Sequence, residues 1–556
     1  MTLSPRAIAV LTILLALPAG PSPAAAPSQR SVSVVMFGAI ADGKTDCRQP
    51  IQKAIASVAA AGGGIVRFPK SDKPYLVGGT ITLTSSDVVL LGPGATIKLA
   101  DGAANGTRGQ RTTESQVHVI RVTGTPQRKL RNIGIKGLTI DANIHRQADF
   151  YNPRAIVIER AEHVLVADVT IVRTFVGLDF GAGSSHCEAR NCIIHDWTED
   201  GFDASGDADK GSGAITTDIR FVNCHARGAP NSTGNAWEIE DGVRRVRVVD
   251  CSVTDVPRGN AFGIRHHWTA GPIDVSSDIE LRRVTIKNVG GKYGIYSNSA
   301  PRDRFPTNRL TDVRLHDVIC PAPVLFYGPM ENILIEGGKY GTIHLGWDYG
   351  SKSKPNPGDP RPLVNTTVRI RNAQAGHINI FAQSGNFDFH NLLIDATGDH
   401  AFNIFEGTRV RIAGCTLTGA AKAAIALHGQ AAPKIVNTIL WGNPRPFATE
   451  VGKPSLDHCC VQGGVPRVAI DKGGNVASDP LFTKGPRGTF YLADTASGQK
   501  KSSPCINSGS GLAAFLRLDE FTTRTDRIRD TKTVDIGFHH SLDSAPRHPA
   551  TKRRNR

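Results

Sequence analysis

Five short segments between residues 177 and 298 repeat one pattern, in which a small residue is followed mostly by alternating apolar and polar residues. The segments begin 24 to 35 residues apart, at Gly177, Gly201, Ala236, Gly263 and Gly294. A repeat of this length that carries one short strand is typical of a solenoid, in which each copy stacks on the next. The repeat therefore predicts an all-β solenoid instead of a set of separate globular domains.

Strand alternation decides which side chains of the repeat face outward. The residues expected to point inward are Leu178, Phe202, Trp237, Ile264 and Ile295. Their neighbours should then form one exposed column: Asp179, Asp203, Glu238, Arg265 and Tyr296. A second outward column should lie two residues further along each strand: Gly181, Ser205, Glu240, His267 and Asn298. We expect the chemistry of the protein on these two columns.

Three like charges stack at adjacent levels of the first column, where strands lie roughly 4.8 Å apart. Such stacking of Asp179, Asp203 and Glu238 destabilises a sheet unless something neutralises it. A bridging cation, a shared proton or Arg265 would each do so. Calcium accepts carboxylate oxygens in a loose geometry, so these three residues are the predicted calcium ligands. The alternative is a solvated face without a function.

Residues 1–26 have the features of a signal peptide: Arg6, an apolar run over residues 7–17 and a stretch of small residues. The run is too short to anchor the chain in a bilayer, and no later segment is long and apolar enough to span one. We therefore expect a secreted or periplasmic protein that is monomeric and binds no membrane.

The chain carries 65 Lys and Arg against 50 Asp and Glu, a net charge of +15. An exported basic protein suits an anionic polysaccharide as its partner. Nucleic acid would also suit the charge, but no nucleic acid-binding motif is present, so we do not expect this partner. The basic tail at 546–556 is expected to be disordered.

Six of the ten cysteines fall into two groups. Cys192, Cys224 and Cys251 recur at the equivalent place in three successive copies, which predicts an inward stack of thiols that behave as small buried hydrophobes. Cys459, Cys460 and Cys505 are the better candidates for a disulfide.

Residues 31–100 combine short strands with one amphipathic helix. Ile51, Ile55 and Val58 recur at helical spacing and predict a helix over about 48–61 that caps the N-terminal end of the core. Residues 101–433 should hold further coils; the copies at 342–345, 378–380, 402–404 and 424–427 keep the alternation without a carboxylate. Residues 434–545 should form the last coils and a C-terminal cap.

Three ordered motifs in the N-terminal part resemble the opening of the pectate lyase-like family: FGAIADGKTD at 37–46, IQKAI at 51–55 and GGGIVRFP at 62–69. This family includes rhamnogalacturonase- and epimerase-like proteins with a right-handed parallel β-helix. The resemblance implies that fold and action on a polysaccharide. It does not identify the reaction, because one β-helix hosts lyases, hydrolases, epimerases and binding proteins. The motif sets of polygalacturonases and alginate epimerases are not present.

The leading hypothesis is a polysaccharide lyase that works by β-elimination. A base would remove the C-5 proton of a uronate while a cation holds its carboxylate. His267 or Lys292 is favoured as base, with Arg265 as the carboxylate clamp; the family resemblance implies an arginine base, and the roles stay open. Asp203 and Glu238 complete the catalytic set. The candidate substrate-binding residues are Tyr296, Asn298, Lys292 and Glu240.

Two other functions stay open. A glycoside hydrolase with carboxylates about 5 Å apart retains anomeric configuration, whereas a separation of roughly 6.5–9.5 Å gives inversion. The pair Asp203–Glu238 fits the first and Asp179–Glu238 the second. A non-catalytic glycan-binding solenoid would instead need a groove of aromatic side chains, and the first column offers only Tyr296.

Overall fold

The computed structural model describes residues 30–104, 117–147, 153–206, 214–266, 275–299, 309–328, 330–346, 363, 366–382 and 384–542. The predicted signal peptide, the basic tail and His267 lie outside these residues. No helix in the described ranges has the length and apolar character needed to cross a membrane.

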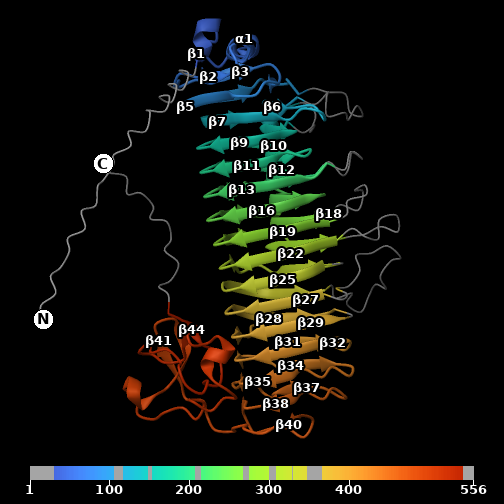
Figure 1. Ribbon diagram of the computed structural model, residues 1–556, viewed down its shortest axis with the longest axis vertical. Helices are drawn as coiled ribbons and strands as arrows, with labels where there is room; N and C mark the ends of the chain where they lie inside the picture. The colour runs from blue at the N-terminus through green and yellow to red at the C-terminus, as the bar shows by residue number, and fades with distance from the viewer. Residues whose placement is uncertain are drawn as a thin grey trace, which may run out of the picture.

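A single sheet of 40 strands runs from β1 (Ser31–Ser33) to β40 (Ile470–Asp471), and the pairs within it are parallel. Neighbours in the sheet come from successive coils: β12 (Ile193–Ser205) pairs with β15 (Asn235–Glu240), and β15 pairs with β18 (Asn260–His266). The strands therefore stack along one long axis (Figure 1). The chain is a right-handed parallel β-helix, as the sequence predicts.

The face that carries the two predicted columns is one stack of parallel strands. From the N-terminal to the C-terminal end it comprises β6 (Ile120–Thr123), β8 (Ile156–Glu159), β10 (Thr170–Gly181), β12, β15, β18, β21 (Ile295–Ser299), β24 (Val324–Tyr327), β26 (Lys339–Leu345), β28 (Gln374–Ile380), β31 (His400–Phe405), β34 (Ala423–His428) and β37 (Phe447–Ala448).

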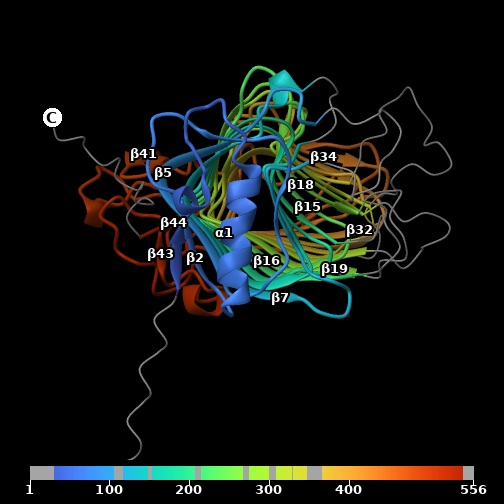
Figure 2. The same ribbon diagram turned by 90° about the horizontal axis from the view of Figure 1, so that it is seen from above.

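The predicted helix forms as α1 (Arg48–Ala60). Ile51, Ile55 and Val58 are buried and belong to the main hydrophobic core, since their spacing places them on one side of a helix. Seen from above, α1 lies across the N-terminal end of the solenoid (Figure 2). Three glycines follow the helix at φ of 84°, 126° and 152°, a backbone conformation that glycine adopts most easily.

Asparagine and aspartate close the turns between strands. Asn191, Asn223 and Asp250 all have positive φ, which these short polar side chains tolerate. The Asn223 amide donates to Asn191 Oδ1 at 2.9 Å, which links one coil to the next. The three cysteines that follow these residues are buried, as predicted. The disulfide prediction is wrong, because all ten cysteines are described and each is a free, buried thiol.

The C-terminal segment forms two small antiparallel pairs, β41 (Phe482–Gly485) with β42 (Gly488–Leu492) and β43 (Phe521–Thr522) with β44 (His540–Ser541). It lies beside the last coils (Figure 1), where the His539 amide donates to Asn391 Oδ1 at 2.6 Å.

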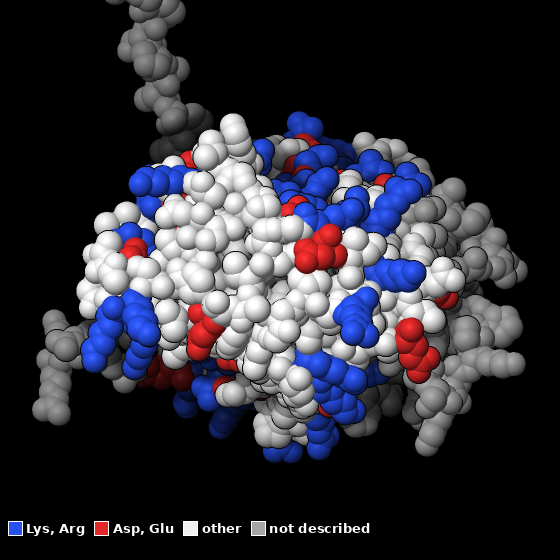
Figure 3. Space-filling view, turned by 90° about the horizontal axis from the view of Figure 1, so that it is seen from below, with Lys and Arg blue, Asp and Glu red and all other residues white. Residues whose placement is uncertain are grey.

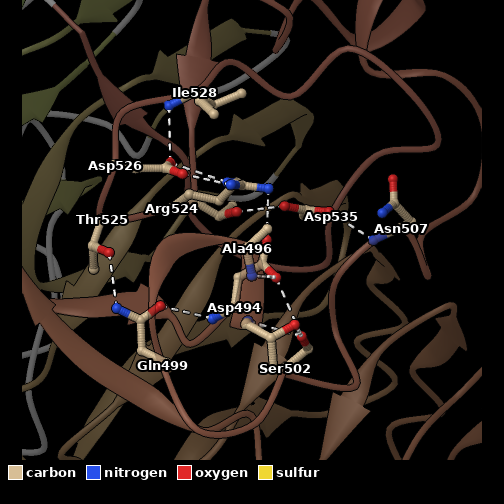
Figure 4. Close-up of polar contacts among 12 residues, drawn as sticks. Asp494, Ala496, Gln499, Ser502, Asn507, Arg524, Thr525, Asp526, Ile528 and Asp535 are labelled. Atoms are coloured by element: carbon tan, nitrogen blue, oxygen red, sulfur yellow. Dashed lines mark hydrogen bonds and ion pairs between the residues drawn. The ribbon is translucent and has the colours of Figure 1, made fainter.

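Polar contacts hold this segment together (Figure 4). Arg524 forms an ion pair with Asp494 at 2.6 Å, and Asp535 accepts the Asn507 amide at 2.7 Å. Viewed from the C-terminal end, the molecule carries more Lys and Arg than Asp and Glu on its surface (Figure 3).

Candidate active site

The strand register confirms most of the predicted first column. Asp179 on β10 pairs with Asp203 on β12, and Asp203 pairs with Glu238 on β15. The column continues through Gly263 on β18 to Tyr296 on β21. Three carboxyl groups therefore occupy three successive levels, with a glycine between the last of them and the tyrosine.

Arg265 does not belong to this column, so that prediction is wrong. It pairs with Glu240 on one side and with Asn298 on the other, which places it in the second column. Phe262, and not Ile264, stacks on Trp237, with ring centroids 5.2 Å apart. A shift of two residues keeps the same side chains facing inward, so alternation alone does not reveal it.

The prediction of an exposed column is also wrong. Asp179, Asp203 and Glu238 lie on the outward side of their strands, yet their exposed fractions are only 3%, 3% and 1%. Burying a carboxylate is costly unless an opposite charge or hydrogen bonds compensate for the lost water. The three carboxyl groups differ in the hydrogen bonds and ion pairs that compensate for the lost water.

Asp179 has a cationic partner. Arg154, in the segment before β8, forms an ion pair with its carboxylate, and Ser205 Oγ donates to Asp179 Oδ1 at 3.3 Å. Burial alone would lower the pKa of Arg154, but the negative charge of Asp179 raises it overall. Arg154 therefore stays a cation, and its ion pair favours the charged form of Asp179. Arg154 is a residue that the sequence reasoning missed, since it lies in no repeated segment.

Glu238 is held from two sides. The Asn235 side-chain amide donates to its carboxylate, and Arg265 forms an ion pair with it. Arg265 Nε also lies 3.8 Å from Glu240 Oε2. Even so, burial and the charges of Asp200 and Glu240 raise the pKa of Glu238 well above its ordinary value.

Gly263 allows Glu238 and Tyr296 to approach each other. A Cβ atom at this position would lie 2.5 Å from Glu238 Oε2 and 3.0 Å from Tyr296 Oη, so a larger residue would displace both side chains. Asn235 Nδ2 donates to Tyr296 Oη at 3.4 Å, and the Arg265 guanidinium lies 5.9 Å from the centre of the tyrosine ring. These side chains form one connected polar unit around the space above Gly263.

Asp203 differs from its neighbours because no hydrogen bond or ion pair reaches its side chain in the described part of the chain. Burial and the charges of Asp179 and Glu240 raise its pKa well above the ordinary value, although Arg154 acts in the opposite direction. Asp203 therefore keeps its proton at pH values where an exposed aspartate has lost it.

Asp200 is a further buried acid, and its charge acts on Glu238. Its carboxylate accepts the Asn235 amide at 3.1 Å, and its exposed fraction is 8%. Burial and the charges of Glu240 and Glu199 raise its pKa to about 7.

The remaining predicted residues lie at the margin of the site or beyond it. Lys292 is exposed, with Nζ 5.3 Å from the Tyr293 ring, which in turn lies 6.5 Å from the ring of Tyr296. The side chain of Asn298 is not among those described, and neither is His267.

No group of three or more His, Cys, Asp or Glu residues within the described ranges has a geometry that would hold a metal ion. The cations in contact with Asp179 and Glu238 are the guanidinium groups of Arg154 and Arg265. These guanidinium groups weaken the case for calcium at Asp179, Asp203 and Glu238, and a calcium titration tests it.

Comparison with known proteins shows the fold. No family model and no curated protein matches the chain. The N-terminal fragment of gene product 12 of bacteriophage phi29 has 16% identity and a TM-score of 0.51, over 75% of this chain and 71% of the fragment.

Two further solved structures are similar over most of their length. The A-module of a mannuronan C-5 epimerase from Azotobacter vinelandii has 16% identity and a TM-score of 0.43, over 79% of this chain and 99% of the module. An exopolygalacturonase from Thermotoga maritima has 14% identity and a TM-score of 0.33, over 77% and 91%. These two likenesses have TM-scores below 0.5 and carry no conclusion about the activity of this chain.

Proposed function

We propose that the protein is a retaining glycoside hydrolase that acts on a polysaccharide. The observation that carries the proposal is the pairing of two buried acids at adjacent levels: Asp203, whose pKa is raised well above its ordinary value, and Asp179, which forms an ion pair with Arg154. Adjacent strands lie roughly 4.8 Å apart, close to the separation of about 5 Å that retaining enzymes use. Two neighbouring carboxyl groups whose environments give them different pKa values can serve as the general acid and the nucleophile.

In the first step, Asp203 gives its proton to the glycosidic oxygen while an Asp179 oxygen bonds to the anomeric carbon. The bond between that carbon and the leaving oxygen breaks, which releases one sugar fragment and leaves the other on Asp179. In the second step, the Asp203 carboxylate takes a proton from water, and the water oxygen displaces Asp179 from the anomeric carbon. The net reaction adds one water across the bond and restores both residues.

The polar unit around Gly263 is suited to binding a sugar next to this pair. Asn235, Glu238, Arg265 and Tyr296 offer hydrogen-bond donors and acceptors from three successive strands. Fixed donors and acceptors of this kind hold a reacting bond in position against the catalytic pair.

A lyase is the alternative outcome, and the described residues favour it less. β-Elimination needs a group that can accept a proton. Burial alone would lower the pKa of Arg265, but the charge of Glu238 raises it overall. Burial and the charge of Glu238 also raise the pKa of Tyr296. Both side chains therefore keep their protons at neutral pH, which leaves Lys292 and His267 as the candidate bases.

The resemblance of residues 37–69 to the pectate lyase-like family supports a polysaccharide as substrate, and the net charge of +15 supports one that carries acidic groups. The features of residues 1–26 support a secreted or periplasmic location.

The test is incubation of the purified protein with a panel of neutral and uronic acid-containing polysaccharides. New reducing ends without ultraviolet absorbance from a conjugated double bond identify hydrolysis, and nuclear magnetic resonance of the first product should show retained anomeric configuration. Asp203→Asn should lower turnover about 10²- to 10⁴-fold, the usual contribution of a general acid. The matched control is Asp255→Asn, which changes a half-exposed carboxylate on β17 (Ser252–Val256).

Each alternative result points elsewhere. Products that absorb in the ultraviolet would show a lyase, and inverted configuration would remove Asp179 as the nucleophile. Full turnover in folded Asp203→Asn would contradict the assignment of the acid.

A further inference from the structure

Aromatic side chains continue the second column beyond the acidic residues. Tyr327 ends β24, Phe405 ends β31 and His428 ends β34. Phe405 pairs with His428. Ile380 pairs with Ile404, so the residues that follow them, Phe381 and Phe405, lie at the same position on neighbouring coils. We call these four residues the aromatic ladder: Tyr327, Phe381, Phe405 and His428. Tyr327 pairs with Asn298, which pairs with Arg265, so the ladder continues the column that contains Arg265.

Three rings of the ladder, those of Phe381, Phe405 and His428, contact one another across successive coils. The ring centroids of Phe381 and Phe405 are 5.0 Å apart, and those of Phe405 and His428 are 4.1 Å apart with nearly parallel planes. His428 is exposed, and the other three side chains are half-buried. The outward side of the sheet therefore carries a strip of aromatic surface that remains accessible to solvent.

Amide side chains run beside this strip in the first column. Tyr296 is followed by Leu325, His344, Asn379 and Asn403 on successive strands. The Asn403 amide donates to Asn379 Oδ1 at 2.7 Å, and Asn379 Nδ2 lies 3.2 Å from His344 Nδ1. The His344 ring also stacks on Phe381 at 6.5 Å. The strip thus has apolar ring surface next to uncharged hydrogen-bonding groups.

The charge of the sheet changes at Tyr296. On the N-terminal side the two columns hold Asp179, Asp203, Glu238, Glu240 and Arg265. On the C-terminal side, none of the described positions of the two columns from β24 to β34 is Lys, Arg, Asp or Glu. Recognition there must depend on apolar contact and on neutral hydrogen bonds.

We propose that the aromatic ladder and the adjacent His344, Asn379 and Asn403 bind uncharged sugar units of the polysaccharide that the acidic site cleaves. This inference rests on the proposed function and names the chemical class of the sugars on one side of the cleaved bond. The chain lies along the solenoid axis from Asp203 towards β34. Its C–H faces contact the rings, and its hydroxyl groups bond to the amides.

The geometry favours this occupant for two reasons. The ladder lies on the same stack of strands and the same face as the catalytic pair, so a chain that leaves the acidic site along the axis passes directly over it. Successive coils lie roughly 4.8 Å apart, which is comparable to the advance of an extended saccharide chain per sugar, so each coil presents a similar surface to each successive unit.

The test measures binding, so that it does not depend on catalysis. Asp203→Asn protein is titrated by calorimetry with neutral and with uronic acid oligosaccharides of increasing length. Neutral oligosaccharides should bind more tightly as they lengthen. Adding Phe405→Ala should lower the affinity for the longest one by about 3- to 10-fold, the range expected for one lost aromatic contact, with a smaller loss for the shortest.

Two further variants separate binding from a purely structural role. Phe405→Tyr keeps the aromatic contact and should restore the affinity. Phe515→Ala changes a phenylalanine that is 83% exposed in the C-terminal segment and should leave the affinity unchanged.

The outcomes separate the two proposals. An affinity of folded Phe405→Ala equal to that of the parent at every length, or preferential binding of uronic acid oligosaccharides along the ladder, overturns the ladder proposal alone. If neither series binds Asp203→Asn protein and the wild type cleaves no polysaccharide, the proposed function fails together with the ladder.

Discussion

Asp200→Asn should change how the stability of the protein depends on pH. In the wild type, burial and nearby carboxylates raise the pKa of Asp200 from 3.8 to about 7. The substitution replaces a titrating carboxyl group with an amide of the same shape. The side-chain oxygen of the new amide can still accept the hydrogen bond from the Asn235 backbone, which donates to Asp200 at 3.1 Å in the wild type.

The sign follows from which state binds more protons. Between pH 3.8 and 7 the folded state keeps the proton on Asp200 while the unfolded state has lost it. Stability therefore falls as pH rises through this window, and the loss is complete above about pH 7. A shift of about three pKa units corresponds to about 4 kcal/mol. The variant should thus match the wild type near pH 4 and exceed its unfolding free energy by up to about 4 kcal/mol near pH 8.

Urea unfolding, followed by circular dichroism at a series of pH values, measures the unfolding free energy of the wild type and of Asp200→Asn. Asp255→Asn is the control, because this half-exposed carboxylate lies outside the buried cluster and should give no comparable change with pH. A stability difference between Asp200→Asn and wild type that is the same at pH 4 and pH 8 would refute the reasoning, as would a variant that is less stable at pH 8.

Two further predictions concern the charges of the same site. Arg265→Lys should lower turnover by roughly 10²-fold, because an ammonium group cannot replace the guanidinium contacts to Glu238 and Glu240; unchanged kinetics in a folded variant would remove Arg265 from the site. Millimolar calcium should leave the thermal midpoint unchanged, because arginines and protons already balance the carboxylates. A rise in the midpoint that Asp203→Asn abolishes would instead establish the calcium site, since a ligand of the folded state stabilises it by mass action.

The fold was accessible from sequence because it depends on local, repeated patterns. Alternation over four residues gives a strand, repetition gives the stack, and the spacing of Ile51, Ile55 and Val58 gives the helix at the N-terminal end. The register between coils does not follow from these local patterns, because it depends on how many residues each turn and insertion contains. At β18 the repeat was aligned two residues too far along, and Arg265 was consequently assigned to the wrong column.

Burial was the second property that local pattern did not provide. Alternation places Asp203 on the outward side of its strand, and an outward side chain is ordinarily exposed. Whether other parts of the chain cover it is decided by long-range packing. Arg154 and Asp200 were missed for a related reason, since their importance comes from contacts with other coils and not from their own segments. The aromatic ladder was missed because Phe381 and Phe405 each follow the repeated segment by one residue.

The charge balance of the site explains why it contains a proton donor at all. Among the described residues, five buried or half-buried carboxyl groups cluster around two guanidinium groups: Asp179, Asp200, Asp203, Glu238 and Glu240 against Arg154 and Arg265. Full ionisation would leave an excess of three negative charges in a place with little water. Three of the carboxyl groups have a raised pKa: Asp200, Asp203 and Glu238. Protonation therefore removes the charge that the arginines leave unbalanced, and of these three groups Asp203 alone has no hydrogen bond or ion pair among the described residues to hold it as an anion.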